Sequence, residues 1–188
     1  MFKRVTVLAA LVLFAFASAA EAQQKGTIEI GADNAIGYVI TSKFQDAEVP
    51  DALFATVPFG TWRLGFFINE QFSIEPSLGF DFVSLTDDAG SAMALDFTAD
   101  VVYNMPSGLF FHGGGILTYA RQDPGGDAET ESESQFGFGA GVGYRYQLVD
   151  MLYLRIGARG FYLLESEDDG LPSSLWIAGT FGFSFMTK

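Results

Sequence analysis

The segment from residue 72 to residue 82 alternates between apolar and polar residues at every step. Its apolar positions are Phe72, Ile74, Pro76, Leu78, Phe80 and Phe82, and the positions between them are Ser73, Glu75, Ser77, Gly79 and Asp81. Successive side chains of a β-strand point to opposite sides, so this period of two predicts a strand with one apolar and one polar face. Two carboxylates lie on the polar face.

Seven further segments show the same alternation, and none after the N-terminal region has a convincing helical period of 3.6 residues. The pattern predicts strands at residues 27–40, 62–68, 72–82, 93–103, 109–121, 136–146, 152–159 and 175–185. Residues 53–59 are out of phase with the strand that follows them. Pro58 and Gly60 therefore predict a bulge or kink at this point.

The connections between these strands alternate in length. Three are short, at residues 69–71, 104–108 and 147–150. Four are longer and polar, at residues 41–52, 86–91, 122–134 and 164–174. This alternation predicts an even number of antiparallel strands, with short turns and both termini at one end and long loops at the other.

The N-terminal region has the composition of a secretory signal peptide. Its basic start precedes an apolar core, residues 5–17, that is too short to cross a bilayer as a helix. We expect cleavage after Ala22, with Ala19 as a second cleavage point and an uncleaved membrane anchor as the alternative. This reading divides the chain into a signal peptide, residues 1–22, and one domain, residues 23–188.

Eight amphipathic strands behind an export signal predict an all-β fold, an eight-stranded antiparallel up-and-down transmembrane β-barrel. No stretch after the signal peptide has about 18 consecutive apolar residues, which argues against a membrane-spanning helix. The apolar faces would point to lipid and the polar faces to the lumen. A soluble calycin-like barrel, with the two faces exchanged, is the alternative. The net charge of −13 argues against a nucleic-acid partner, and the absence of cysteine excludes disulfides and a cysteine-linked lipid anchor.

The predicted lumen contains charges of both signs. The inward positions carry Glu29, Asp33, Arg63, Glu75, Asp81, Asp96, Asp100, His112, Arg145, Arg155 and Arg159. Similar depths are expected for Arg63, Glu75, Asp96, Arg155 and Arg159. Side chains just fill the interior of an eight-stranded barrel, and unpaired charges there are costly, so we expect a salt-bridge network that plugs the lumen. A gated polar conduit is the alternative.

Glycine occupies every inward position from Gly137 to Gly143. This glycine face leaves room for bulky side chains of neighbouring strands. The expected occupants are Tyr153, Arg155, Arg159 and Phe161. The same residues form a GxGxGxG pattern, but no helix follows it, so a phosphate site is not expected.

His112 is the only histidine, and three glycines rather than a serine follow it. A histidine without a nearby nucleophile predicts a structural hydrogen bond rather than catalysis. Nothing in the alternation of the strands indicates a substrate cleft around the paired carboxylates. We therefore expect no catalytic residue, no cofactor and no metal site.

Aromatic residues gather near the predicted strand ends. The expected interfacial set is Tyr38, Trp62, Tyr103, Tyr119, Tyr144, Tyr146, Tyr162 and Phe185. Such side chains suit the two membrane surfaces, where a ring meets both lipid and water. The third and fourth loops are acidic, with Glu129, Glu131, Glu133, Glu165, Glu167, Asp168 and Asp169. These carboxylates either keep the loops solvated or hold divalent cations against lipopolysaccharide phosphates.

The whole chain after the signal peptide resembles the small outer-membrane barrels of the OmpA/OmpX type. Its closing segment, Gly179–Phe185, is similar to the C-terminal signal read by the barrel-assembly machinery, although Met186, Thr187 and Lys188 follow the last aromatic residue. The resemblance implies Sec-type export and an integral outer-membrane location. It also implies periplasmic chaperones and the assembly machinery as transient partners, outer-membrane lipids and lipopolysaccharide as surroundings, and a monomer.

These observations favour a non-enzymatic outer-membrane barrel with a plugged polar lumen, serving envelope structure or surface interaction. A narrow porin or transporter for small solutes is the first alternative, and a lipid A-modifying barrel enzyme is the second. The sequence does not decide between functions carried by loops.

Overall fold

The computed structural model describes residues 25–42, 52–55, 60–84, 91–123, 130–166 and 170–187. The signal peptide, with its cleavage point at Ala22, lies outside these residues and stays a prediction, as does the domain boundary that depends on it. Glu129, Glu167, Asp168 and Asp169 also lie outside them. Among the described residues, no helix is long and apolar enough to cross a membrane.

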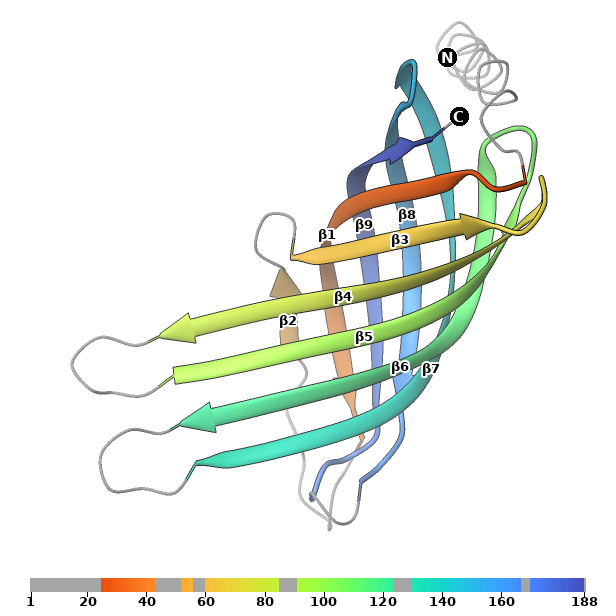
Figure 1. The fold of residues 1–188 in the computed structure, drawn as a ribbon. Helices are drawn as coiled ribbons and strands as arrows, with labels where there is room; N and C mark the ends of the chain where they lie inside the picture. The colour runs from red at the N-terminus through yellow and green to blue at the C-terminus, as the bar shows by residue number, and fades with distance from the viewer. Residues whose placement is uncertain are drawn as a thin grey trace, which may run out of the picture.

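Within the described residues, nine β-strands form one antiparallel sheet that closes on itself (Figure 1). They are β1 (Ile28–Thr41), β2 (Ala52–Ala55), β3 (Thr61–Phe67), β4 (Phe72–Ser84), β5 (Ser91–Asn104), β6 (Leu109–Asp123), β7 (Glu131–Val149), β8 (Leu152–Leu163) and β9 (Ser174–Met186). From β3 onward each strand pairs with the next in the chain, and β9 pairs with β1 along 13 residue pairs to close the barrel.

The two strands β2 and β3 together occupy the place of one barrel strand. β3 pairs with the first half of β1, from Ile28 to Asp33, and β2 pairs with its second half, from Ile36 to Val39. Gly60 directly precedes β3, and Pro58 lies in the undescribed segment before it. The predicted eight-stranded antiparallel barrel is thus confirmed, with its second strand described in two parts.

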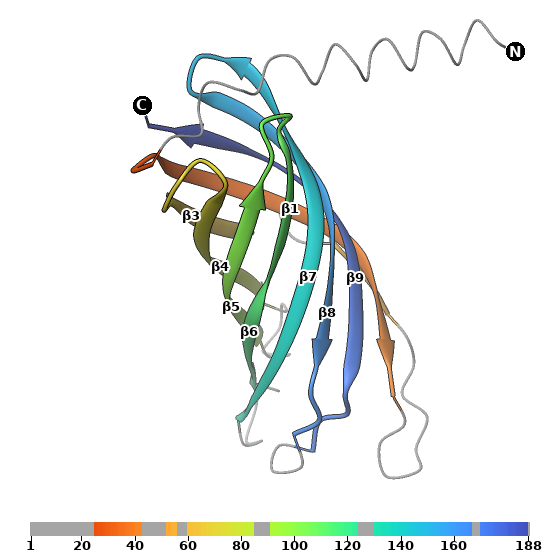
Figure 2. The same cartoon turned by 90° about the vertical axis from the view of Figure 1, so that its right-hand side faces the viewer.

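Short turns connect strands at one end of the barrel, the turn side, and the C-terminus lies there as well (Figures 1 and 2). In the first turn, the side-chain oxygen of Asn69 accepts hydrogen bonds of 2.8 Å from the backbone N–H groups of Gln71 and Phe72. The last short turn contains Met151 at a φ of 69°, in the left-handed region. Polar turn residues thus fix the register of hairpins whose loops are very short.

The strand β7 differs from the prediction at both ends. It begins at Glu131, so Glu131 and Glu133 are strand residues and not part of the third loop. It also continues to Val149, past an irregularity after Gln147, so the predicted turn at 147–150 is shorter. Hydrogen bonding to β6 from Gln122↔Glu131 onward extends the hairpin into sequence whose polarity alone suggested a loop.

The apolar faces of the strands point away from the lumen. Leu78 is 50% exposed, whereas its lumen-facing neighbours on the same strand, Glu75 and Ser77, are buried. One row of outward residues in register across four strands is Leu78, Phe97, Leu117 and Phe136. This arrangement is the inverse of a soluble barrel, so the calycin-like alternative is wrong. A small apolar cluster of Phe67, Tyr153 and Met186 packs inside the barrel.

Candidate functional site in the barrel lumen

Alternation along each strand delivers the polar residues of all strands to one enclosed space. Barrel closure then brings together residues that are far apart in the sequence, such as Glu29 on β1 and Arg155 on β8. Of the 11 residues predicted for the lumen, nine contact another member of the set through an ion pair or, for His112, through a hydrogen bond. These nine are Glu29, Asp33, Arg63, Glu75, Asp100, His112, Arg145, Arg155 and Arg159.

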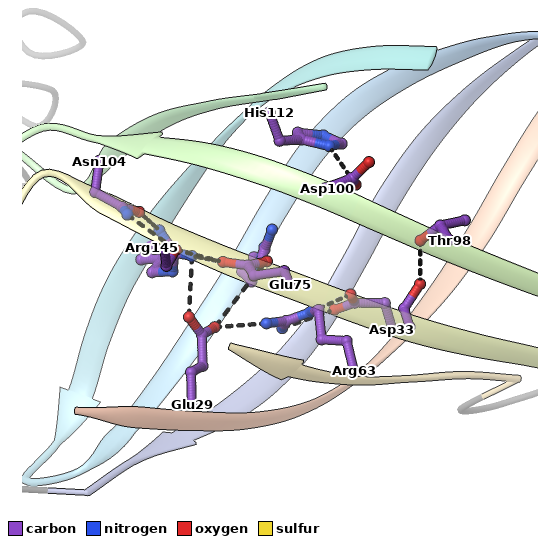
Figure 3. A network of polar contacts seen from close by, with 12 residues as sticks. Glu29, Asp33, Arg63, Glu75, Thr98, Asp100, Asn104, His112 and Arg145 are labelled. Carbon is purple, nitrogen blue, oxygen red and sulfur yellow. Dashed lines mark hydrogen bonds and ion pairs between the residues drawn. The ribbon is translucent and has the colours of Figure 1, made fainter. Parts of the chain in front are cut away.

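Glu29 lies at the centre of this network and is 0% exposed (Figure 3). One of its oxygens accepts a hydrogen bond of 2.6 Å from Nη1 of Arg63 and a longer one of 3.4 Å from Nη1 of Arg155. Its other oxygen lies 2.9 Å from Nη2 of Arg145. Three guanidinium groups around one buried carboxylate compensate the cost of removing that carboxylate from water.

Glu75 connects the opposite walls of the barrel. It accepts a hydrogen bond of 2.6 Å from Nη2 of Arg145 and another of 2.7 Å from Nη1 of Arg155. Glu75 is on β4, whereas the two arginines are on β7 and β8, so these contacts span the lumen. On the other side of Glu29, Arg63 donates to Asp33 through Nε at 2.7 Å.

An aromatic ring and an amide complete the network on the turn side, and neither residue was predicted to belong to it. Phe110 lies beside two guanidinium groups, with its ring centroid 4.3 Å from Cζ of Arg145 and 4.1 Å from Cζ of Arg155. Asn104 accepts a hydrogen bond of 2.5 Å from Arg145 and donates one of 3.1 Å to Ser73. The ring quadrupole attracts both cations.

Asn104 corrects a prediction. It was expected to open a turn, but it is the last residue of β5 and is fully buried. Its place on the inward face follows from the same alternation that places Asp100 there. Phe110 also had a usable signal, because it shares the inward face of β6 with His112. What the alternation could not show is that an apolar ring would stack on the arginines.

A second group of charges lies further from the turns. Asp100 accepts a hydrogen bond of 3.3 Å from Nη2 of Arg159, and the same oxygen lies 2.9 Å from Nδ1 of His112. The guanidinium of Arg159 also lies over the ring of Phe161, 3.8 Å from its centroid. Beside this group, Ser77 and Thr98 share a hydrogen bond of 2.5 Å between their hydroxyls.

Asp81 and Asp96 are brought into the lumen but not into the network. Neither forms an ion pair with any base that the structure describes. The expectation that Asp96 lies level with Glu75 is wrong, because Glu75 pairs with Asp100 and Asp96 pairs with Gly79. Counting residues from the turns ignored the stagger between strands of a closed barrel. The described network therefore has four carboxylates and four arginines, and two carboxylates remain outside it.

The glycine face of β7 accommodates different side chains from those expected. A Cβ on Gly143 would collide with the ring of Phe110, and one on Gly141 would collide with the imidazole of His112. Only Phe161, which covers Gly139, belongs to the predicted set. Tyr153, Arg155 and Arg159 are not among the nearest atoms to these four glycines. The prediction considered β8 alone, whereas β6 on the other side of β7 supplies two of the occupants.

Comparison with known proteins identifies the family. The sequence matches the family model described as outer membrane protein beta-barrel domain over residues 6–186. The chain belongs to this family. It is therefore an outer-membrane β-barrel, and its exposed apolar belt faces lipid.

Solved structures share the fold of this outer-membrane barrel at low sequence identity. The crystal structure of Neisserial surface protein A is 15% identical, covers 85% of this chain and 98% of its own, and has a TM-score of 0.58. Outer membrane protein AlkL, solved by solid-state NMR in DMPC bilayers, is 12% identical over 92% and 94% of the two chains, with a TM-score of 0.53. The attachment invasion locus protein Ail of Yersinia pestis, in complex with sucrose octasulfate, is 16% identical over 86% and 100%, with a TM-score of 0.51. No curated protein sequence gives a significant match.

The predicted interfacial aromatics of this outer-membrane barrel are outward or half-buried, and most of them lie near strand ends. Tyr103 contacts Phe72 beside the first turn, with ring centroids 5.3 Å apart, and Tyr162 contacts Phe138 at 5.8 Å. Trp62 differs, because it pairs with Leu78, the central residue of β4. The remaining members are Tyr38, Tyr119, Tyr144, Tyr146 and Phe185.

The chemistry available in the lumen is ion pairing. His112 contacts Asp100 and the ring of Phe110, and no hydroxyl nucleophile is among its described contacts. No group of three or more potential ligands among the described residues is arranged to hold a metal ion.

Proposed function

We propose that this outer-membrane barrel is a non-enzymatic structural protein of the envelope whose lumen is closed by the ion-pair network. The observation that carries the proposal is the contact of Glu75 on β4 with arginines on β7 and β8, which crosses the lumen rather than lining it. Glu29, Arg145 and Phe110 fill the same cross-section and are almost fully buried. Separating these charges to open a channel would leave them uncompensated in a confined space.

The absence of a role in catalysis is part of this proposal. A barrel enzyme acting on lipid needs a nucleophile or an activated water beside its histidine. The described surroundings of His112 are instead a carboxylate, an aromatic ring and the glycine face of β7. These contacts support a role for His112 in holding Asp100, which in turn binds Arg159.

Export through the Sec pathway, assembly by the periplasmic chaperones and the barrel-assembly machinery, and a monomeric state belong to the same proposal. The outward apolar belt supports contact with outer-membrane lipids and lipopolysaccharide. Interaction with the surroundings would then be carried by the long connections at the loop side, the end opposite the turns. Loops on a rigid scaffold are the usual carriers of such contacts.

Ion conductance in planar bilayers tests closure. We expect the purified wild-type protein to give no stable single-channel steps. Arg155→Ala removes one contact across the lumen and should produce transient leak currents, whereas Lys25→Ala, before β1, should behave as the wild type. Stable, large steps from the wild-type protein would refute the plug and make the narrow porin the better interpretation.

A further inference from the structure

The lumen contains a cavity of about 110 Å³ on the loop side of the central carboxylates. Arg63, Glu75 and Arg155 form one end of it, and Asp100, His112 and Arg159 line its middle. This space is large enough for several water molecules or one small organic molecule. Its chemistry decides which kind of molecule fits.

Arg159 is the arginine of the lumen with the weakest contacts. Arg63 and Arg145 each make hydrogen bonds of 2.6 Å or shorter to their partners, and Arg155 makes one of 2.7 Å. The described hydrogen bonding of Arg159 is one contact of 3.3 Å with Asp100. Its Nε is buried and has no partner among the described residues. Buried donors are rarely left in this state, so the guanidinium of Arg159 has capacity to donate to an anionic partner.

Asp96 supplies the opposite charge in the same cavity. It lies on β5 at the position opposite Gly79, and no described base forms an ion pair with it. Asp100, the partner of Arg159, is four residues away on the same strand, about 13 Å along the chain direction. A free carboxylate and an arginine with an unused donor thus lie along one cavity.

One part of the remaining wall is apolar, while Ser, Thr and Asn side chains line other parts of it. Phe161, Leu163, Trp176 and Ala178, from β8 and β9, line the cavity. The indole of Trp176 is held in place by a hydrogen bond of 2.9 Å from Nε1 to Ser174. A hydrocarbon group would find matching surface here, as in most small-molecule sites.

We infer that this cavity binds a small zwitterionic solute with an apolar side group. A carboxylate on the solute would accept from Arg159, and an ammonium group would pair with Asp96. A simple anion would leave Asp96 without a partner, and a simple cation would leave the unpartnered Nε of Arg159 without one. A dipolar solute satisfies both ends. The inference is independent of conduction, because binding requires no passage through the plug.

The two tryptophans provide a direct measurement. Trp176 lines the cavity, whereas Trp62 is 61% exposed on the lipid side and serves as an internal control. The folded full-length mature barrel would be titrated in micelles while the two indole N–H signals are followed by NMR. The three probes are L-valine, isobutylamine and 3-methylbutanoate, which share one branched hydrocarbon group. L-valine carries both an ammonium and a carboxylate, isobutylamine carries only the ammonium, and 3-methylbutanoate carries only the carboxylate.

We expect L-valine to shift the Trp176 signal saturably, at a half-saturating concentration at least about tenfold below that of either single-charge probe. The Trp62 signal should stay in place. Asp96→Asn should remove the advantage of L-valine over 3-methylbutanoate. Glu70→Gln, the same chemical change at the exposed turn after β3, should keep it.

Two results would overturn the inference. One is the absence of a saturable shift of Trp176 with L-valine up to about 100 mM, a concentration at which even weak binding is visible. The other is equal binding of the three probes, which would show that the cavity selects hydrocarbon and not charge. Asp96 has no described ion pair, so loss of folding is not expected to obscure either result.

Discussion

The turn-side and loop-side halves of the lumen are built on the same strands but differ in how charge is compensated. Around Glu29 and Glu75, every carboxylate contacts at least one arginine. Around Asp81 and Asp96, the described residues supply no ion pair, and a cavity remains next to Asp96. Alternation makes both halves polar. The difference between the halves depends on the side chains that face each carboxylate across the lumen: arginines form a plug in one half, and a cavity remains in the other.

Glu29→Gln should cause the largest loss. It leaves Arg63, Arg145 and Arg155 without their shared partner inside the barrel. Breaking one side of a buried ion pair costs about 3–5 kcal/mol. The check is reversible urea unfolding in phospholipid vesicles. Asp81→Asn makes the same chemical change in the loop-side half, and we expect it to change the free energy of unfolding by less than about 0.5 kcal/mol. Equal losses would remove the distinction between the halves.

Leu78→Arg tests the boundary between lipid and lumen. Leu78 is half exposed on the lipid side in the middle of β4. An arginine near the middle of the bilayer costs about 2–4 kcal/mol in a transmembrane barrel. The fraction of heat-modifiable, folded barrel on gels should fall accordingly. The folded fraction of the Ser77→Arg variant, whose new side chain points into the lumen, should fall less. The reverse order of the two losses would mean that the lipid and lumen faces are inverted.

Gly143→Ala probes packing in the filled half. The added Cβ would collide with the ring of Phe110, which also contacts two arginines. Overpacking of this kind costs about 1–3 kcal/mol in unfolding free energy. The matched change, Gly113→Ala, places its Cβ 3.4 Å from the nearest atom, at an ordinary contact distance, and should be close to neutral. If both variants unfold alike, Phe110 is not rigidly held.

Thr118→Arg should change the free energy of unfolding least, and it should raise this free energy where the other variants lower it. Thr118 lies directly opposite Asp96 in the register of β5 and β6, and both line the cavity. A cross-strand pair of opposite charges contributes about 0.2–1 kcal/mol. We expect a slight gain in unfolding free energy, and also loss of the preference for L-valine because Asp96 becomes occupied. A loss of stability would show that the cavity is too small for an arginine.

Much of this structure could be predicted from local pattern. The period of two assigned the faces of Leu78, Glu75 and Arg145, because strand geometry alone decides to which side a side chain points. The connection lengths indicated an even number of strands. These properties depend on neighbours in the sequence, and the sequence displays them directly.

The partners within the lumen could not be predicted in the same way. Contacts such as that of Glu29 with Arg145 depend on the stagger between the strands of the barrel. Because of this stagger, two residues at the same height in the barrel are not the same number of residues away from a turn. The same reason explains the misplaced depth of Asp96. The contacts of Phe110 with two arginines, and of His112 with Gly141, depend on which neighbouring strand places its side chains over the glycine face. The periodicity of the sequence does not specify this strand.

A double-mutant cycle over Glu75 and Arg155 tests most directly whether ion pairs across the lumen hold the barrel together. Glu75→Gln, Arg155→Gln and the double variant would be compared with the wild type by urea unfolding in vesicles. Groups in contact within a network couple by about 0.5–3 kcal/mol, and we expect a value in the upper half of that range. Additivity within about 0.5 kcal/mol would contradict the account, because it would mean that the 2.7 Å contact between β4 and β8 contributes nothing to closure.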